Sequence, residues 1–152
     1  MSRYVSDYEP RDGAPPWEFW AQAVANATKG KRGQAFLREL REALLAMPDK
    51  RLIAGDMITP TGEVCALGQF AVYKGKAAEL RQSFIFQNEG EEYTEEEDLS
   101  ESANWVAYRF NVPTCLAFDV AYANDEEFHY DTPEARWRLM LQWIDARLLV
   151  PA

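Results

Sequence analysis

The stretch from Gly33 to Gly68 constrains the fold more than any other part of this 152-residue chain. From Phe36 onward its apolar residues recur at three- and four-residue steps, which places them on one side of a helix. These residues are Leu37, Leu40, Leu44 and Met47. Pro48 ends the pattern, because proline lacks an amide hydrogen and restricts the residue before it. We therefore expect an amphipathic helix, beginning near Gln34, that packs on a core.

Helical patterns also occur on both sides of this stretch. They predict helices over residues 17–28, 102–110, 114–123 and 133–148. The last of these has Thr132 as its cap and Pro133 in its first turn. The fold class is therefore expected to be mainly α, with five to six helices. We expect an extended arm over residues 1–16 and one globular domain over residues 17–152.

Residues 52–73 are compatible with two structures. Residues 64–74 are rich in Ala, Cys and Gly, which favours a helix in which Gly68 allows another element to approach closely. The alternative is a small β-hairpin that pairs residues 52–58 with residues 63–73 across the turn that contains Pro60.

The negative charge is concentrated in the second part of the chain. The net charge is −9, and residues 61–152 hold seventeen Asp or Glu against seven Lys or Arg. Residues 89–101 contain eight acids and no base. Such a surface repels phosphate backbones, so we expect a protein partner with a basic surface and no direct nucleic-acid binding. A solvated loop leading into a helix capped by Asp98 or Ser100 would explain the same acids.

The cysteines and the length of the apolar runs indicate the cellular compartment in which the chain is expected. Cys65 and Cys115 each lie among small apolar residues, which is typical of buried free thiols in a reducing cytosol. No apolar run approaches 18 residues, and the first residues lack the apolar core of a signal peptide. A cytoplasmic location is expected, without a membrane span. We assign no cofactor and no metal.

Asp119 is the only charge between Val112 and Ala123, on a helix that is otherwise apolar. A partly buried carboxylate needs a partner. We expect that partner to be one of three arginines, Arg109, Arg51 or Arg136. The simplest interpretation is a structural ion pair.

His129 is the only histidine, so any Cys-His or Ser-His-Asp site would have to use it. It lies in a loop-like acidic segment with Asp125 and Glu126. Together with Asp119 these residues define an alternative, a small metal-dependent or hydrolytic enzyme. No recognisable motif accompanies them, and we assign no catalytic residue.

Residues 106–120 resemble the turn of a helix-turn-helix, with Asn111 at the position that needs a left-handed residue. The second helix carries no Arg, Lys, Gln or Asn with which to contact bases or phosphates. We therefore expect two helices packed across a tight turn, without a DNA-binding role.

Two surfaces are candidates for partner binding. The first is the acidic run, represented by Glu92, Glu95, Glu96, Glu97 and Asp98. The second is an apolar line on the C-terminal helix with Leu139 and Trp143, displaced from the main stripe. That main stripe contains Trp137, Leu141, Ile144 and Leu148. A helix covered on two sides gives the same pattern. An exposed line would suit a partner or a second copy of the chain, as in a self-associating structural component.

Two segments, within residues 37–68 and 122–144, resemble short uncharacterised proteins of phages, prophages and their bacterial hosts. The matching positions include Pro48, Lys50-Arg51-Leu52-Ile53, Cys65-Ala66-Leu67-Gly68, Asn124-Asp125-Glu126, Thr132-Pro133-Glu134, Trp137 and Trp143. The resemblance implies a cytosolic accessory protein of a mobile element, and it implies no activity or catalytic residue. We therefore expect a non-enzymatic acidic binding protein that antagonises a host defence or nucleic-acid-handling protein.

Overall fold

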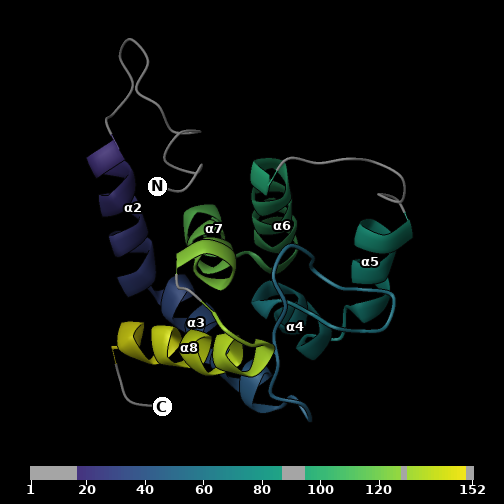
Figure 1. Ribbon diagram of the computed structural model, residues 1–152. Helices are drawn as coiled ribbons and strands as arrows, with labels where there is room; N and C mark the ends of the chain where they lie inside the picture. Colours follow the sequence, from purple (N-terminus) through teal and green to yellow (C-terminus); the bar gives the residue numbers. More distant parts are fainter. Residues whose placement is uncertain (1–16, 87–94, 128–129, 150–152) are drawn as a thin grey trace.

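The computed structural model describes residues 17–86, 95–127 and 130–149, which form helices joined by turns and by one long loop over residues 46–65 (Figure 1). Seven α-helices lie in this part of the chain: α2 (Trp17–Lys29), α3 (Lys31–Leu45), α4 (Ala66–Tyr73), α5 (Ala77–Arg81), α6 (Glu95–Phe110), α7 (Thr114–Tyr122) and α8 (Pro133–Arg147). Two π-helical turns, η1 (Gln82–Phe86) and η2 (Ala123–Glu127), continue α5 and α7. The mainly α class is confirmed, with more helices than the five to six expected. The proposed arm over residues 1–16 lies outside the described residues.

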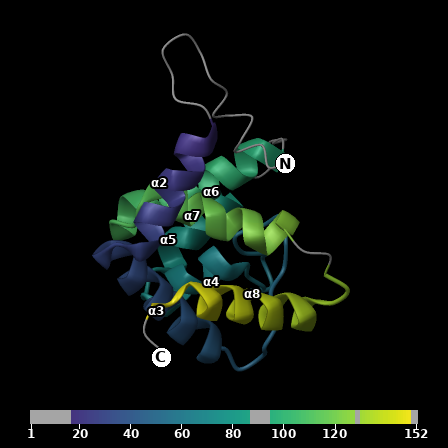
Figure 2. The same cartoon turned by 90° about the vertical axis from the view of Figure 1, so that its left-hand side faces the viewer.

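Helix α3 carries the apolar stripe predicted from the sequence. All of its members are buried: Phe36, Leu37, Leu40, Leu44 and, just beyond the helix, Met47. Helices α2, α4 and α8 pack against α3. In Figure 2, α8 runs across the lower part of the molecule, with α2, α6 and α7 above it. No helix in the described ranges is long and apolar enough to cross a membrane.

Helix α3 begins at Lys31, three residues before the expected start. A start near Gln34 would leave Gly33 outside the helix. Gly33 instead lies inside the first turn, where a Cβ atom would stand 1.8 Å from the carbonyl oxygen of Ala27. Glycine is needed at this position because α2 and α3 approach each other there at backbone distance.

The hairpin alternative for residues 52–73 is wrong, and the favoured helix is confirmed as α4. Among the described residues the segment before α4 contains a single antiparallel bridge, between Ile58 and Val64. Gly55 and Gly62 both have positive φ angles, of 86° and 92°, and they turn the chain before a ladder can extend. The result is an irregular loop that packs on α4.

Helices α6 and α7 pack across a tight turn, as predicted. Asn111 occupies the left-handed position with a φ angle of 54°. Helix α6 begins at Glu95, however, so Asp98 and Ser100 lie within the helix and neither caps it. This correction places the run from Glu95 to Asp98 in the first turn, where acidic residues are favoured by the helix dipole.

Helix α8 begins as predicted, with the Thr132 hydroxyl accepting a hydrogen bond from the Ala135 amide at 3.0 Å. Its most buried residues are Met140, Trp143 and Ile144. The exposed Trp143 patch is therefore not present, since this side chain is 3% exposed. The helix packs against both α3 and η2, so it is covered on two sides and only part of Leu139 reaches solvent.

Candidate functional site

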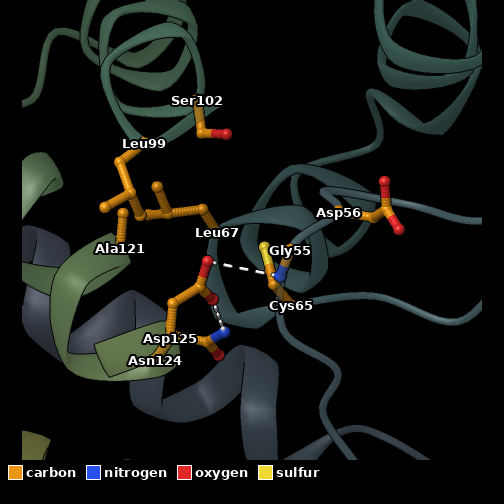
Figure 3. A pocket seen from close by; sticks show the side chains of 9 residues that line it. All are labelled: Gly55, Asp56, Cys65, Leu67, Leu99, Ser102, Ala121, Asn124 and Asp125. Carbon is orange, nitrogen blue, oxygen red and sulfur yellow. Dashed lines mark hydrogen bonds between the residues drawn. The ribbon is translucent and has the colours of Figure 1, made fainter. Parts of the chain in front are cut away.

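The candidate site is a small pocket between α6, η2 and the loop that precedes α4, where ionisable and polar side chains from these segments lie together (Figure 3). Its lining residues are Gly55, Asp56, Cys65, Leu67, Leu99, Ser102, Ala121, Asn124 and Asp125. The cavity measures about 20 Å³. A volume of this size holds one water molecule and no organic substrate.

Asn124 joins three segments at the base of this pocket. Its side chain is 1% exposed, and its Oδ1 atom accepts a hydrogen bond from the Ala66 amide at 3.1 Å. Its Nδ2 atom donates to the Ile53 carbonyl at 2.9 Å and to Asp125 Oδ1 at 2.7 Å. Because a buried amide without partners is costly, these bonds hold η2, α4 and the loop together. The sequence pattern indicates only a loop-like acidic segment around Asn124.

Asp125 also stabilises the loop that precedes α4, through a hydrogen bond to its backbone. Its Oδ2 atom accepts a hydrogen bond from the Gly55 amide at 3.2 Å. Gly55 is one of the two left-handed glycines of the loop. Both carboxylate oxygens of Asp125 thus bond to groups that line the pocket, and the dashed lines in Figure 3 show both contacts.

Cys65 caps helix α4 with its thiol. The Sγ atom accepts a hydrogen bond from the Gly68 amide at 3.3 Å and donates to the Met57 sulfur at 3.5 Å. Burial and, to a smaller extent, the negative charge of Asp125 raise the pKa of Cys65 to about 12. The group is thus a protonated thiol at neutral pH, which is a structural cap and a poor nucleophile. Cys65 is buried as expected, whereas Cys115 is partly exposed, and neither forms a disulfide.

Asp119 lies in different surroundings, on α7. Burial raises the pKa of its carboxyl group to about 6; the nearby Arg147 guanidinium acts in the opposite direction, and Glu127 adds to the increase. Among the residues that the structure describes, none forms a hydrogen bond or ion pair with this carboxylate. The expected ion pair is therefore not formed.

The three arginines considered as partners of Asp119 are all engaged elsewhere. Arg109 pairs with Glu79, and Arg51 pairs with Glu134. Arg136 donates to the Asn124 carbonyl. The neighbouring cation is Arg147 at the end of α8, which sequence spacing could not indicate because α8 reaches α7 only through the tertiary fold.

Arg147 is itself held by Trp143. Its guanidinium lies 3.7 Å from the centroid of the indole ring, and its Nη1 atom donates to the Trp143 carbonyl at 3.0 Å. The indole N–H donates to Glu127 Oε2 at 2.9 Å. The charged neighbours of Asp119 are therefore Arg147 and Glu127, and both of them interact with Trp143.

The residues of the enzyme alternative do not meet in one described site. Asp125 is bonded at the small pocket, Asp119 has the charged neighbours Arg147 and Glu127, and Glu126 is exposed. His129 lies outside the described residues. Within those residues, no group of three or more His, Cys, Asp and Glu side chains is placed to hold a metal ion.

The acidic run of α6 lies next to the small pocket. Leu99 and Ser102, which follow the run on α6, line the same pocket as Asp56 and Asp125. Residues 95–98 form the turn immediately before Leu99. The acidic turn of α6 thus leads directly into a residue of the pocket lining, while Glu92 lies outside the described residues.

Comparisons with protein-family models, with curated proteins and with solved structures found no significant match. The function therefore has to be inferred from the fold and from these residues.

Proposed function

We propose that this chain is a non-enzymatic binding protein that docks its acidic face onto a basic surface of another protein. The observation that supports it is the position of the acidic turn of α6, residues 95–98, beside the pocket lined by Asp56 and Asp125. The turn that holds these four acidic positions leads directly into Leu99, which lines the same pocket as Asp56 and Asp125. We call these positions the acidic rim, defined by Asp56, residues 95–98 and Asp125.

Carboxylates on the acidic rim would steer and orient a basic partner. Complementary charge increases the rate of encounter and fixes the register of a complex more than it adds affinity. An α-helix has 3.6 residues per turn, so the four acidic positions 95–98 lie around one turn at the start of α6. They concentrate negative charge there, and a basic surface that otherwise binds phosphate groups would be attracted to it.

The partner that fits this arrangement best is a protein whose basic surface otherwise binds nucleic acid. The resemblance of residues 37–68 and 122–144 to phage and prophage proteins favours a host defence or nucleic-acid-handling protein in the bacterial cytoplasm. The chain would then occupy the basic surface as a competitor of phosphate groups.

Affinity capture from a bacterial host lysate, at low and at high salt, tests the proposal. The test variant carries amides at all four acidic positions of the α6 turn: Glu95→Gln, Glu96→Gln, Glu97→Gln and Asp98→Asn. The control variant makes the same change in net charge at exposed acids on other elements: Glu42→Gln, Asp49→Asn, Glu63→Gln and Glu134→Gln. We expect a partner that is released by salt, lost from the test variant and retained by the control variant.

Capture that salt does not weaken, or equal capture by both variants, would contradict docking through the acidic rim. Competition supplies a second readout, because added duplex DNA should displace the chain from a partner that also binds DNA. A partner that binds the chain and DNA at the same time would exclude the competitive version. The mass of the protein in solution tests the alternative of a self-associating structural component. A monomeric mass would exclude that alternative.

A further inference from the structure

A second hollow lies away from the acidic rim, between α3, the end of α4 and the turn that joins α6 to α7. Its volume is about 120 Å³. Three aromatic residues line its apolar part: Phe36, Phe70 and Phe110. Arg32, Lys74 and Asn111 supply polar groups to the same lining. The combination of an aromatic wall and cationic side chains defines the chemistry of this hollow.

The aromatic wall is rigid. Phe70 contacts Phe36 edge to face with ring centroids 4.9 Å apart, and it contacts Phe110 in the same way at 5.1 Å. Phe36 and Phe70 are each 2% exposed. Such a surface favours an apolar group of a ligand, because burial removes apolar area from water without reorganising the wall.

The cationic side chains differ in how they are paired. Lys74 forms an ion pair with Glu39, which also lines the hollow. Arg32 donates to the side-chain oxygen of Asn111 at 3.3 Å, and no carboxylate pairs with Arg32 among the described residues. The guanidinium has five N–H donors, so most of them stay available to an acceptor in the hollow.

Asn111 is held in place by the fold. It adopts the left-handed conformation, with a φ angle of 54°, that ends α6 and starts the turn to α7. Asparagine tolerates this conformation better than most residues. Its side chain thereby orients the Arg32 guanidinium at the edge of the hollow.

We infer that this hollow binds a carboxylate carried on a short apolar group. The carboxylate would bond to the Arg32 guanidinium, which matches its planar geometry, and Lys74 would offset the negative charge of Glu39, which lines the same hollow. The apolar group would lie on the phenylalanine wall. Because an enclosed cavity of about 150 Å³ takes benzene, 120 Å³ suits a ligand of about four to six heavy atoms. A free short-chain acid and the C-terminal residue of a peptide both present this chemistry.

Titration of the full chain, followed by the amide resonances of residues 32, 36, 74 and 111, tests the inference. The probes are butyrate, the uncharged butyramide, and a short peptide ending in valine with a free or an amidated C-terminus. We expect saturable shifts with butyrate or with the free peptide, at a dissociation constant of about 1–10 mM for a fragment of this size. The stronger of these two probes identifies the source of the carboxylate. Butyramide and the amidated peptide should not bind.

Arg32→Gln should weaken binding by about tenfold or more, because a charge-assisted hydrogen bond is lost. Arg38→Gln is the matched control, since Arg38 is exposed on the same helix and does not line the hollow. Lys74→Gln should weaken binding as well, because the negative charge of Glu39 would then face the ligand carboxylate without its ion-pair partner, and this variant serves if the Arg32 variant does not fold. No saturable shift with either carboxylate, or equal affinity for acid and amide, would overturn the inference. Neither result would bear on the acidic rim, which uses other residues.

Discussion

Gly68 lies so close to Met57 that a Cβ atom at residue 68 would stand 1.9 Å from the Met57 carbonyl oxygen. Helix α4 therefore touches the loop before it with its backbone. The Cys65 amide donates to the same carbonyl at 3.4 Å, and the two sulfur atoms of Cys65 and Met57 are in contact. This contact allows an irregular loop to cover α4 in place of a strand.

The first prediction concerns Gly68→Ala. The added methyl group meets backbone, which cannot move aside as a flexible side chain can, so the loop has to separate from α4. We expect the free energy of unfolding to fall by about 3 kcal/mol, at the upper end of the usual cost of overpacking. Urea denaturation followed by far-UV circular dichroism measures the change.

Gly30→Ala is the matched control for this variant. A Cβ atom at Gly30 would meet only backbone oxygens at 3.5 and 3.6 Å, which is ordinary contact, and the φ angle of −73° suits alanine. Its effect should lie within about 1 kcal/mol of the wild type. Equal losses in the two variants would mean that α4 and the loop are not packed as closely as described.

The second prediction concerns the buried amide of Asn124. In Asn124→Asp the donor to the Ile53 carbonyl is lost and a second carboxylate is placed beside Asp125. We expect a loss of about 3–5 kcal/mol, because an uncompensated charge would be buried together with an orphaned carbonyl. The control is Asn26→Asp, since Asn26 is exposed and its side-chain oxygen accepts a hydrogen bond from Gln22 within α2. If the two variants unfold at similar urea concentrations, Asn124 does not join the three segments.

Much of the helical framework could be predicted from the sequence, because it depends on local patterns. The stripe on α3 repeats at helical spacing, and Thr132 with Pro133 is a strong start signal for α8. Asn111 marked the turn between α6 and α7. The loop before α4 could not be predicted as such, since its shape depends on the contact between Gly68 and a carbonyl that sequence patterns do not display.

The candidate site could be predicted only in part, because its contacts join residues that are far apart in the sequence. Asn124 accepts from Ala66 across 58 positions and donates to Ile53 across 71. Nothing local distinguishes Asn124 from a solvent-exposed loop residue. The same reason applies to Asp119, whose neighbour Arg147 comes from a different helix. Composition did identify the acidic run, but it could not indicate that Leu99, the next residue on α6, lines the same pocket as Asp56 and Asp125.

The third prediction distinguishes the two thiols. Burial raises the pKa of both cysteines, to about 12 for Cys65, and Cys115 is the one that reaches solvent. An aromatic disulfide reagent at pH 8 should therefore modify one thiol in the native chain and both after unfolding, since the thiolate is the reactive form. Cys115→Ser should abolish the native reaction, whereas Cys65→Ser should leave it in place. Reaction of both thiols at comparable rates in the native chain would contradict the buried position of Cys65.

The fourth prediction concerns the pH dependence of stability at Asp119. Its pKa is raised from 3.8 to about 6, so between these values the folded chain holds a proton that the unfolded chain has lost. Stability contributed by this group is present below pH 4 and is lost as the pH rises through 6. Asp119→Asn keeps the shape without the charge, and it should therefore stabilise the chain at pH 7.5, by at most about 3 kcal/mol.

The measurement is the free energy of unfolding at intervals from pH 4 to pH 7.5, for the wild type and for Asp119→Asn. The difference between the two should grow with pH across the window and then stay constant. Arg147 acts to lower this pKa, so Arg147→Gln should move the window to higher pH, which a purely steric effect of the substitution would not do. Parallel curves for the wild type and Asp119→Asn would show that Asp119 has a solvated carboxylate. An ionised, largely buried Asp119 without a hydrogen-bond partner among the described residues costs stability at neutral pH, and this distinguishes it from Asp125, whose carboxylate is bonded to the loop.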